Sequence, residues 1–269
     1  MDSELSAINT DYGNWISLFF MKWLYAFCAI IAILNGLQFY FFVFSKPLLA
    51  AGGIALFVLF LAFTIYMQLC HNKFSFTNGM LMNKIHKFLV DHLFWNGQGR
   101  LLDVGCGTGA LSVRCAKRYA QAEILGVDNW GKDWSYGKNQ CDTNANAEGI
   151  GIRAKFEQGS LVKLVFEDAS FDAVVSNFVF HKVRAASDKR QLVREALRVV
   201  RKGGSFAFQD MFAQKKYYGN MEDFVEELRK EGITEVHYMH RVENVCGFIP
   251  YFVRAPWVLR GVGLLYGVR

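Results

Sequence analysis

Residues 101–110 read Leu-Leu-Asp-Val-Gly-Cys-Gly-Thr-Gly-Ala, and this stretch is the strongest local signal in the sequence. An apolar run typical of a buried strand leads into three glycines spaced two apart, and a helical pattern follows. Glycine adopts positive φ and carries no Cβ, so the backbone of such a turn can approach a ligand closely. The helix after it presents free N–H groups. The stretch therefore predicts a strand, a ligand-binding glycine loop and a helix, as in nucleotide-type cofactor sites.

Outward from this loop, short apolar runs alternate with helical patterns along residues 71–269. The sequence predicts strands over 100–104, 124–128, 153–157, 171–177, 205–210, 235–240 and 261–268, and helices over 78–94, 110–119, 137–148, 188–201 and 221–231. This alternation is typical of a mainly parallel sheet with helices on both faces. We therefore expect one α/β domain, Rossmann-like, with a seven-stranded and mainly parallel sheet.

Two uncharged apolar runs, 23–44 and 48–69, precede this domain. A helix of each run is ~33 Å long, and the hydrocarbon core of a bilayer is ~30 Å thick. The runs predict a transmembrane helical hairpin over 23–70, turning at Ser45–Pro47; a pair of buried core helices is the alternative. Because polar groups in lipid need partners, Asn35 and Gln38 are expected to bond across to Thr64 or Gln68.

The flanking charges predict an orientation. Lysines lie at 22, 73, 84 and 87 on the terminal side of the hairpin, against Lys46 in its turn. The positive-inside rule then places both termini and the domain in the cytoplasm, with two spans in the cell membrane. Residues 1–22 are aromatic near the first span and are expected to lie on the bilayer surface.

Composition excludes several classes of protein. Of the 269 residues, 52% are hydrophobic, so the chain is not intrinsically disordered. The net charge of +6 comes without a dense basic run, which argues against nucleic acid as a partner and is compatible with an anionic bilayer. The six cysteines show no CxxC spacing, so we expect neither a disulfide framework nor a metal site. An oligomeric state is not indicated.

Two acidic residues narrow the choice of cofactor. Gly105, Gly107 and Ala110 also satisfy a dinucleotide pattern. Asp103, two residues before the first glycine, would repel a pyrophosphate but suits a cofactor that carries an ammonium group. Asp128 ends the next strand and is placed to accept hydrogen bonds from ribose hydroxyls in either case.

From about residue 78 the chain resembles class I S-adenosylmethionine-dependent methyltransferases. The segment 101–112 (LLDVGCGTGALS) matches the first motif of that family and 125–128 (LGVD) the second. Residues 157–161, 166–177, 197–204 and 263–267 resemble later parts of its sheet. The resemblance implies S-adenosyl-L-methionine as the cofactor. One departure is Ser160, which stands where the family usually has an Asp that binds the adenine amino group.

The resemblance also implies roles by position. The implied cofactor contacts are Asp103 for the ammonium, Gly105, Cys106, Gly107 and Gly109 along the methionine part, Asp128 for the ribose, Asn129 beside the adenine, Ser160 and Leu161 at the adenine edge, and Asn177 facing the methyl group.

His181, beyond the fourth strand, is the best candidate for a general base, because histidine side chains in general exchange protons near neutral pH and ligands gather at this edge of parallel sheets. Asp210, which ends the fifth strand, is the second candidate. Tyr12, Tyr217 and Tyr218 are candidates to close over the site, and Trp130 and Trp134 to shape it.

The expected activity is methyl transfer to a hydrophobic or membrane-near small molecule such as a quinone-like ring, a lipid headgroup or another apolar acceptor. A membrane-tethered NAD(P)-dependent oxidoreductase and a non-catalytic cofactor-binding protein are the alternatives. The aromatic segment 247–259, with Arg254 and Arg260 nearby, suits a membrane interface and equally suits packing on the domain.

Overall fold

The computed structural model describes residues 10–42, 47–77, 79–131 and 137–269. The chain divides into two compact units, residues 13–82 and residues 1–12 together with 83–269. Ser45, Trp134 and the first nine residues of the expected interfacial segment lie outside the described residues.

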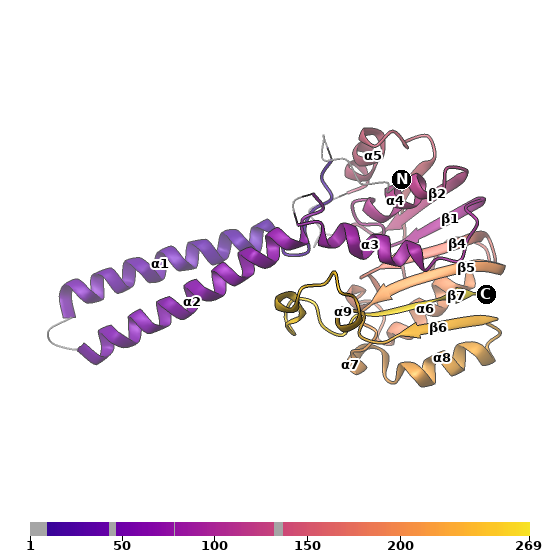
Figure 1. Cartoon of the computed structure of the whole chain (residues 1–269). Coiled ribbons are helices and arrows are strands. Elements are labelled where there is room, and N and C mark those ends of the chain that lie inside the picture. The colour runs from indigo at the N-terminus through magenta and orange to yellow at the C-terminus, as the bar shows by residue number, and fades with distance from the viewer. Residues whose placement is uncertain (1–9, 43–46, 78, 132–136) are drawn as a thin grey trace. The chain divides into compact units, whose positions relative to one another are not determined.

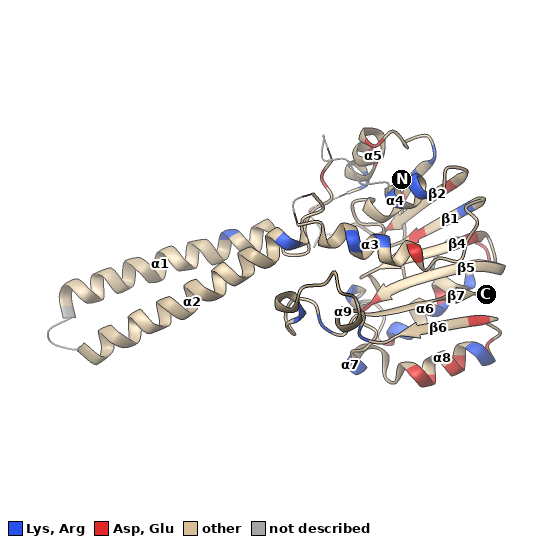
Figure 2. Cartoon of the chain, viewed as in Figure 1, with Lys and Arg blue, Asp and Glu red and all other residues tan. Residues whose placement is uncertain are grey.

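The first unit holds two long apolar helices, α1 (Leu18–Phe42) and α2 (Pro47–Phe74) (Figure 1). Both are long and apolar enough to cross a membrane. Figure 2 shows them almost without charge; their ionised side chains are Lys22 and Lys73. Helix α1 begins five residues before the predicted span. Just before it, Asn14 donates to the carbonyl of His71, and the His71 ring contacts the Ile16 carbonyl at 2.7 Å.

The polar pairing inside the hairpin differs from the prediction. Thr64 lies 3.3 Å from the thiol of Cys28, and the hydroxyl of Tyr25 donates to Gln68. Asn35 instead lies opposite Gly53, where an added Cβ would come within 2.5 Å of its Oδ1. The prediction for Asn35 and Gln38 was wrong because an antiparallel hairpin pairs residues equally distant from its turn. Asn35 is near that turn, whereas Thr64 and Gln68 are far from it.

The second unit is built on one sheet of seven strands, as predicted. The strands are β1 (Gly99–Val104), β2 (Ala122–Asp128), β3 (Ala154–Gln158), β4 (Phe171–Asn177), β5 (Val200–Asp210), β6 (Glu235–Met239) and β7 (Gly263–Val268). Their order is β3-β2-β1-β4-β5-β7-β6. All neighbouring pairs are parallel except those that β7 forms with β5 and β6.

Helices cover both faces of the sheet (Figure 1). The helices that follow α2 are α3 (Leu81–Asp91), α4 (Ala110–Arg118), α5 (Lys138–Ala147), η1 (Phe180–Lys182), α6 (Lys189–Arg198), α7 (Lys215–Tyr218), α8 (Met221–Lys230), α9 (Val242–Val245) and η2 (Tyr251–Arg254). A core of buried side chains joins α6 and α8 to one face, where Val174 and Phe206 project. Asp103 projects from the opposite face and meets Ser112 of α4.

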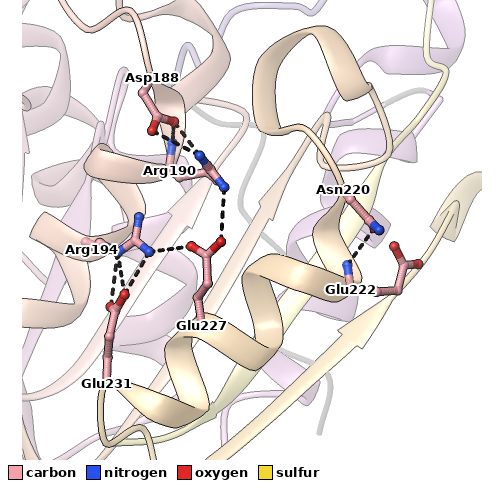
Figure 3. Close-up of polar contacts among 7 residues, drawn as sticks. All are labelled: Asp188, Arg190, Arg194, Asn220, Glu222, Glu227 and Glu231. Carbon is pink, nitrogen blue, oxygen red and sulfur yellow. Dashed lines mark hydrogen bonds and ion pairs between the residues drawn. The ribbon is translucent and has the colours of Figure 1, made fainter.

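An ionic network links α6 to α8 (Figure 3). Arg194 donates to Glu227 at 2.7 Å and to Glu231 at 2.7–3.0 Å, and Arg190 contacts Glu227 at 3.4 Å. Helix α8 starts at the N-cap Asn220, whose side chain accepts from the Glu222 N–H. These contacts fix α8 at the edge of the sheet that β6 forms.

Candidate active site

The glycine loop after β1 has the geometry that its sequence predicts. Gly105, Gly107 and Gly109 have φ of +76°, +57° and +80°, a region that favours glycine. A Cβ on Gly105 would lie 2.3 Å from the Val179 side chain, so this glycine also permits a close approach. A Cβ on Gly107 would meet no atom within 4 Å, so the loop is open at that point. Gly109 is the N-cap residue of α4.

Asp128 ties the glycine loop to the end of β2. Its Oδ2 accepts from the Gly107 N–H at 2.9 Å and its Oδ1 from the Trp130 N–H at 3.0 Å. The Trp130 indole donates in turn to the Gly107 carbonyl at 2.8 Å. Trp130 therefore shapes this loop, and its strained φ of +38° is held by two hydrogen bonds.

The loop after β3 joins the same edge. The Gly159 N–H donates to the Asp128 carbonyl at 2.9 Å, and the Gln158 side chain donates to the Asn129 carbonyl at 2.9 Å. Ser160 is exposed, whereas Leu161 is buried in the core cluster. The structure thus gathers the cofactor residues predicted on β1, β2 and β3, and the adenine contacts of Ser160 and Leu161 stay predictions.

Asp103 is a buried carboxyl beneath the loop. Its Oδ2 accepts from the Ser112 hydroxyl at 2.6 Å. Burial raises the pKa of Asp103 to about 7, against the opposing effect of the Ser112 hydrogen bond. Burial likewise raises the pKa of the Cys106 thiol, so that Cys106 stays protonated and acts as a small packing group. A positive charge beside Asp103 would favour its ionised form.

The N-terminal segment supplies contacts that the sequence did not reveal. Asn144 of α5 receives the Asp11 N–H at 2.9 Å and donates to the Asp11 and Thr108 carbonyls. The Tyr12 hydroxyl donates to Glu148 at 2.9 Å, while the Thr108 hydroxyl donates to the Tyr12 carbonyl. These partners lie up to 136 residues apart, and no local pattern signals them. Asp11 and Tyr12 are thereby held against the glycine loop.

His181 and Asp210, the two predicted catalytic residues, lie side by side. The Nδ1 of His181 is 2.5 Å from the Oδ1 of Asp210, and the Met211 N–H donates to the same oxygen at 2.6 Å. Asp210 is fully buried, while 13% of the His181 side chain is exposed. An ionised Asp210 makes Nδ1 the protonated nitrogen of a neutral imidazole, which leaves the lone pair on Nε2.

Two tyrosines flank this pair. The rings of Tyr217 and His181 lie 5.9 Å apart. Tyr218 is buried, and burial raises the pKa of its phenol, with the negative charge of Asp210 adding to the effect. Tyr217 and Tyr218 therefore border the His181–Asp210 pair. Both belong to α7, a helix that the sequence did not predict.

Asn177 ends β4. This strand lies between β1, which leads into the glycine loop, and β5, which ends at Asp210. Its Oδ1 is buried and has no hydrogen-bond partner among the described residues. The next residue, Phe178, has φ of +57°, and its N–H donates to the Gln209 carbonyl at 2.7 Å. This strained turn fixes Asn177 at the carboxyl edge of the sheet, where ligands gather in open α/β folds.

The residues present fit a cofactor with an ammonium group and a ribose. Three positive-φ glycines form a loop that is open at Gly107, Asp103 offers a carboxyl, and Asp128 ends the neighbouring strand. No group of three or more His, Cys, Asp or Glu suited to a metal occurs within the described ranges.

Comparisons with known proteins agree with this geometry. A methyltransferase-domain family model matches residues 102–208, from β1 into β5. An arsenite methyltransferase of Aquipseudomonas alcaligenes is 31% identical over 121 residues, which cover 44% of this chain and 34% of that protein. A demethylmenaquinone methyltransferase of Deinococcus radiodurans is 36% identical over 105 residues, which cover 39% and 40%. The matched part of this chain, residues 102–208, is a class I S-adenosylmethionine-dependent methyltransferase domain.

The fold of this methyltransferase domain recurs in a solved structure. The geranyl diphosphate C-methyltransferase of Streptomyces coelicolor A3(2) superposes on 71% of this chain and 80% of its own, with a TM-score of 0.52 and 15% identity. The cofactor of the domain is S-adenosyl-L-methionine. The two curated relatives are each matched over less than half of their length. Their names specify chemically unrelated acceptors, so the comparisons leave the acceptor open.

Proposed function

We propose that this protein is a membrane-anchored methyltransferase that transfers a methyl group to a lipid-soluble or membrane-near small molecule. The observation that carries the proposal is the His181–Asp210 pair, in which Asp210 ends β5 and His181 lies in η1, shortly after the carboxyl end of β4. The two apolar helices of the first unit support the membrane part of the proposal.

The cofactor-binding half of the site would be formed by residues from β1, β2 and β3. They are Asp103, Gly105, Cys106, Gly107, Gly109, Asp128, Asn129, Ser160, Leu161 and, from β4, Asn177. When bound, S-adenosyl-L-methionine supplies an electrophilic methyl group on a sulfonium, which is a good leaving group. The main task of the protein is then to orient the acceptor.

His181 acts as the general base where the acceptor atom carries a proton. Asp210 accepts the Nδ1 proton of His181 and thereby directs the Nε2 lone pair away from the strand end. The Met211 N–H keeps the Asp210 carboxylate in place. As His181 takes a proton from the acceptor, the buried negative charge of Asp210 stabilises the imidazolium that forms.

The methyltransferase domain offers a second feature suited to a bilayer. In the segment 247–259, Ile249, Val253, Val258 and Leu259 are buried, whereas Tyr251 and Trp257 are 87% and 65% exposed. Aromatic rings of this kind prefer the headgroup region of a membrane. The segment thus combines packing on the domain with an exposed aromatic edge, and we assign that edge to the bilayer surface.

A label-transfer experiment tests the proposal. The full chain in bilayer discs is incubated with methyl-labelled S-adenosylmethionine and an extract of its source cells, and label is followed into organic and aqueous phases. Label in the organic phase that is lost in Asp128→Ala supports a lipid-soluble acceptor. Label only in the aqueous phase overturns that acceptor class, and no transfer at all overturns the activity.

A further inference from the structure

Gln209 carries a buried side-chain amide in the methyltransferase domain. It is the last residue but one of β5 and is 1% exposed. Neither its Oε1 nor its Nε2 has a hydrogen-bond partner among the described residues, and the same holds for the Oδ1 of Asn177. These two residues are partners in the register of β4 and β5, so their side chains project from the same face of the sheet.

Such an arrangement is costly for a purely structural residue. A buried polar group without a partner loses its bonds to water and gains none, whereas an apolar side chain of similar size would fill the position without that loss. Most buried polar side chains in folded proteins are paired, so each exception calls for a cause. A ligand group that pairs with the amide supplies one.

The position of Gln209 in the sheet indicates whether the cofactor or the acceptor supplies this ligand group. The glycine loop follows β1 and Asp128 ends β2, both on one side of β4, whereas Gln209 lies on β5, on the other side. The cofactor would therefore occupy the β1–β2 side of Asn177, which leaves the β5 side, where Gln209 lies, for the acceptor. Asp210, the next residue, belongs to the His181 pair, so the amide and the proposed base flank the same strand end.

We propose that Gln209, together with Asn177, is the specificity-determining subsite for a hydroxyl group of the acceptor. A hydroxyl both donates and accepts, and so it satisfies the free Oε1 and the free Nε2 of one amide together. The hydroxyl carries a single proton, so the free Oδ1 of Asn177 is an alternative acceptor for that proton and not a simultaneous one. This inference rests on the proposed function and narrows the acceptor class to hydroxylated apolar molecules.

A matched pair of probes tests the subsite by binding alone. 1-Naphthol and 1-methylnaphthalene are similar in size and differ in the hydroxyl. Titration of the full chain, saturated with S-adenosylhomocysteine in bilayer discs, should show about tenfold tighter binding of 1-naphthol, the effect of one buried hydrogen bond. Gln209→Met should abolish that preference, and the exposed Gln191→Met on α6 should keep it. Without ligand, Gln209→Met should also melt at a higher temperature than the wild type, because it removes an unpaired buried amide.

The outcomes separate this inference from the proposed function. A wild-type protein that binds both probes equally, or a Gln209→Met variant that keeps the preference, overturns the subsite. A lower melting temperature of ligand-free Gln209→Met also overturns it, because the amide then has a structural partner. A hydroxyl preference that depends on Gln209 in a protein that transfers no label would uphold the subsite and remove the proposed activity.

Discussion

At the level of single residues, the raised pKa of Asp103 predicts that the affinity for the cofactor depends on pH. Its pKa of about 7 means that half of the carboxyl groups are protonated near neutral pH in the free protein. An ammonium group binds the carboxylate and not the acid, so the affinity for S-adenosylmethionine should fall as the pH drops below about 7, by up to about tenfold per pH unit. Calorimetric titration between pH 5.5 and 7.5 measures this slope.

Asp103→Asn serves as the control, with an affinity that is weaker at pH 7.5 and flat across the range. Stability should change in the opposite sense. Because the folded pKa lies above the unfolded value of about 3.9, the contribution of Asp103 is full below pH 4 and is lost as the pH rises through about 7. An equal pH slope in the wild type and the variant would show that Asp103 does not meet the ammonium.

His181 is the residue on which the rate of transfer should depend most. His181→Asn removes the base, and Asp210→Asn weakens its orientation, so each should lower kcat by about 10²–10⁴-fold with the cofactor Kd unchanged. The exposed His237→Asn is the matched control and should keep its rate. A His181→Asn variant that retains more than a third of kcat would assign the histidine a purely structural role.

At the level of elements, two glycine positions separate the cost of placing a side chain at positive φ from the cost of a steric clash. Gly105→Ala places an alanine at φ +76° and a Cβ 2.3 Å from Val179, so we expect about 2–4 kcal/mol of lost stability. Gly149→Ala has a similar φ of +71° with no atom within 4 Å, and should cost only about 1 kcal/mol. Thermal unfolding in detergent compares the two, and Val179→Ala should restore part of the loss in Gly105→Ala. Equal losses in both alanine variants would contradict the close approach.

The contacts between α6 and α8 test a weaker kind of interaction. Arg194 is about one third exposed and bonds two carboxylates, so Arg194→Met should cost about 1 kcal/mol, and less at high salt. Lys138→Met breaks a single ion pair, with Asp142, that is more exposed than the pairs of Arg194, and it should cost a few tenths of a kcal/mol. Melting curves at low and high salt measure both; a cost for Arg194→Met that salt leaves unchanged would assign it to packing over Phe224 instead.

The local sequence pattern predicted most helices and strands because each has its own hydrophobic periodicity and its own turn residues at the ends. Strand β4 has the predicted bounds of Phe171–Asn177. Strand β5 begins earlier than predicted, at Val200, because Val200 pairs with Phe171 across a shift in register that its charged neighbours Arg201 and Lys202 conceal. The sequence indicated His181 and Asp210 separately, and the adjacency of β4 and β5 brings them together. It did not indicate the unpaired state of Gln209, which depends on side chains from distant segments.

At the level of the whole molecule, the remaining question is the side of the membrane on which the domain works. Two spans return the chain to the side from which it entered, so the N-terminus and the methyltransferase domain should share one compartment. S-adenosylmethionine is an intracellular metabolite, and the flanking lysines favour the same side. The turn between the spans should then face outward.

Cysteine labelling decides this topology. Ser45→Cys places a thiol in the predicted turn between the two spans, and Gln191→Cys places one on the exposed surface of α6. In intact cells an impermeant maleimide should label Ser45→Cys and leave Gln191→Cys unlabelled, while after lysis it should label both. Of the six native cysteines, five are buried and Cys28 is half-buried, so the wild type provides the background. Labelling of Gln191→Cys in intact cells would reverse the orientation, and labelling of neither site after lysis would contradict the exposure of α6. The expected pattern would place the acceptor-binding edge on the side that holds the cofactor, as transfer to a membrane-soluble acceptor requires.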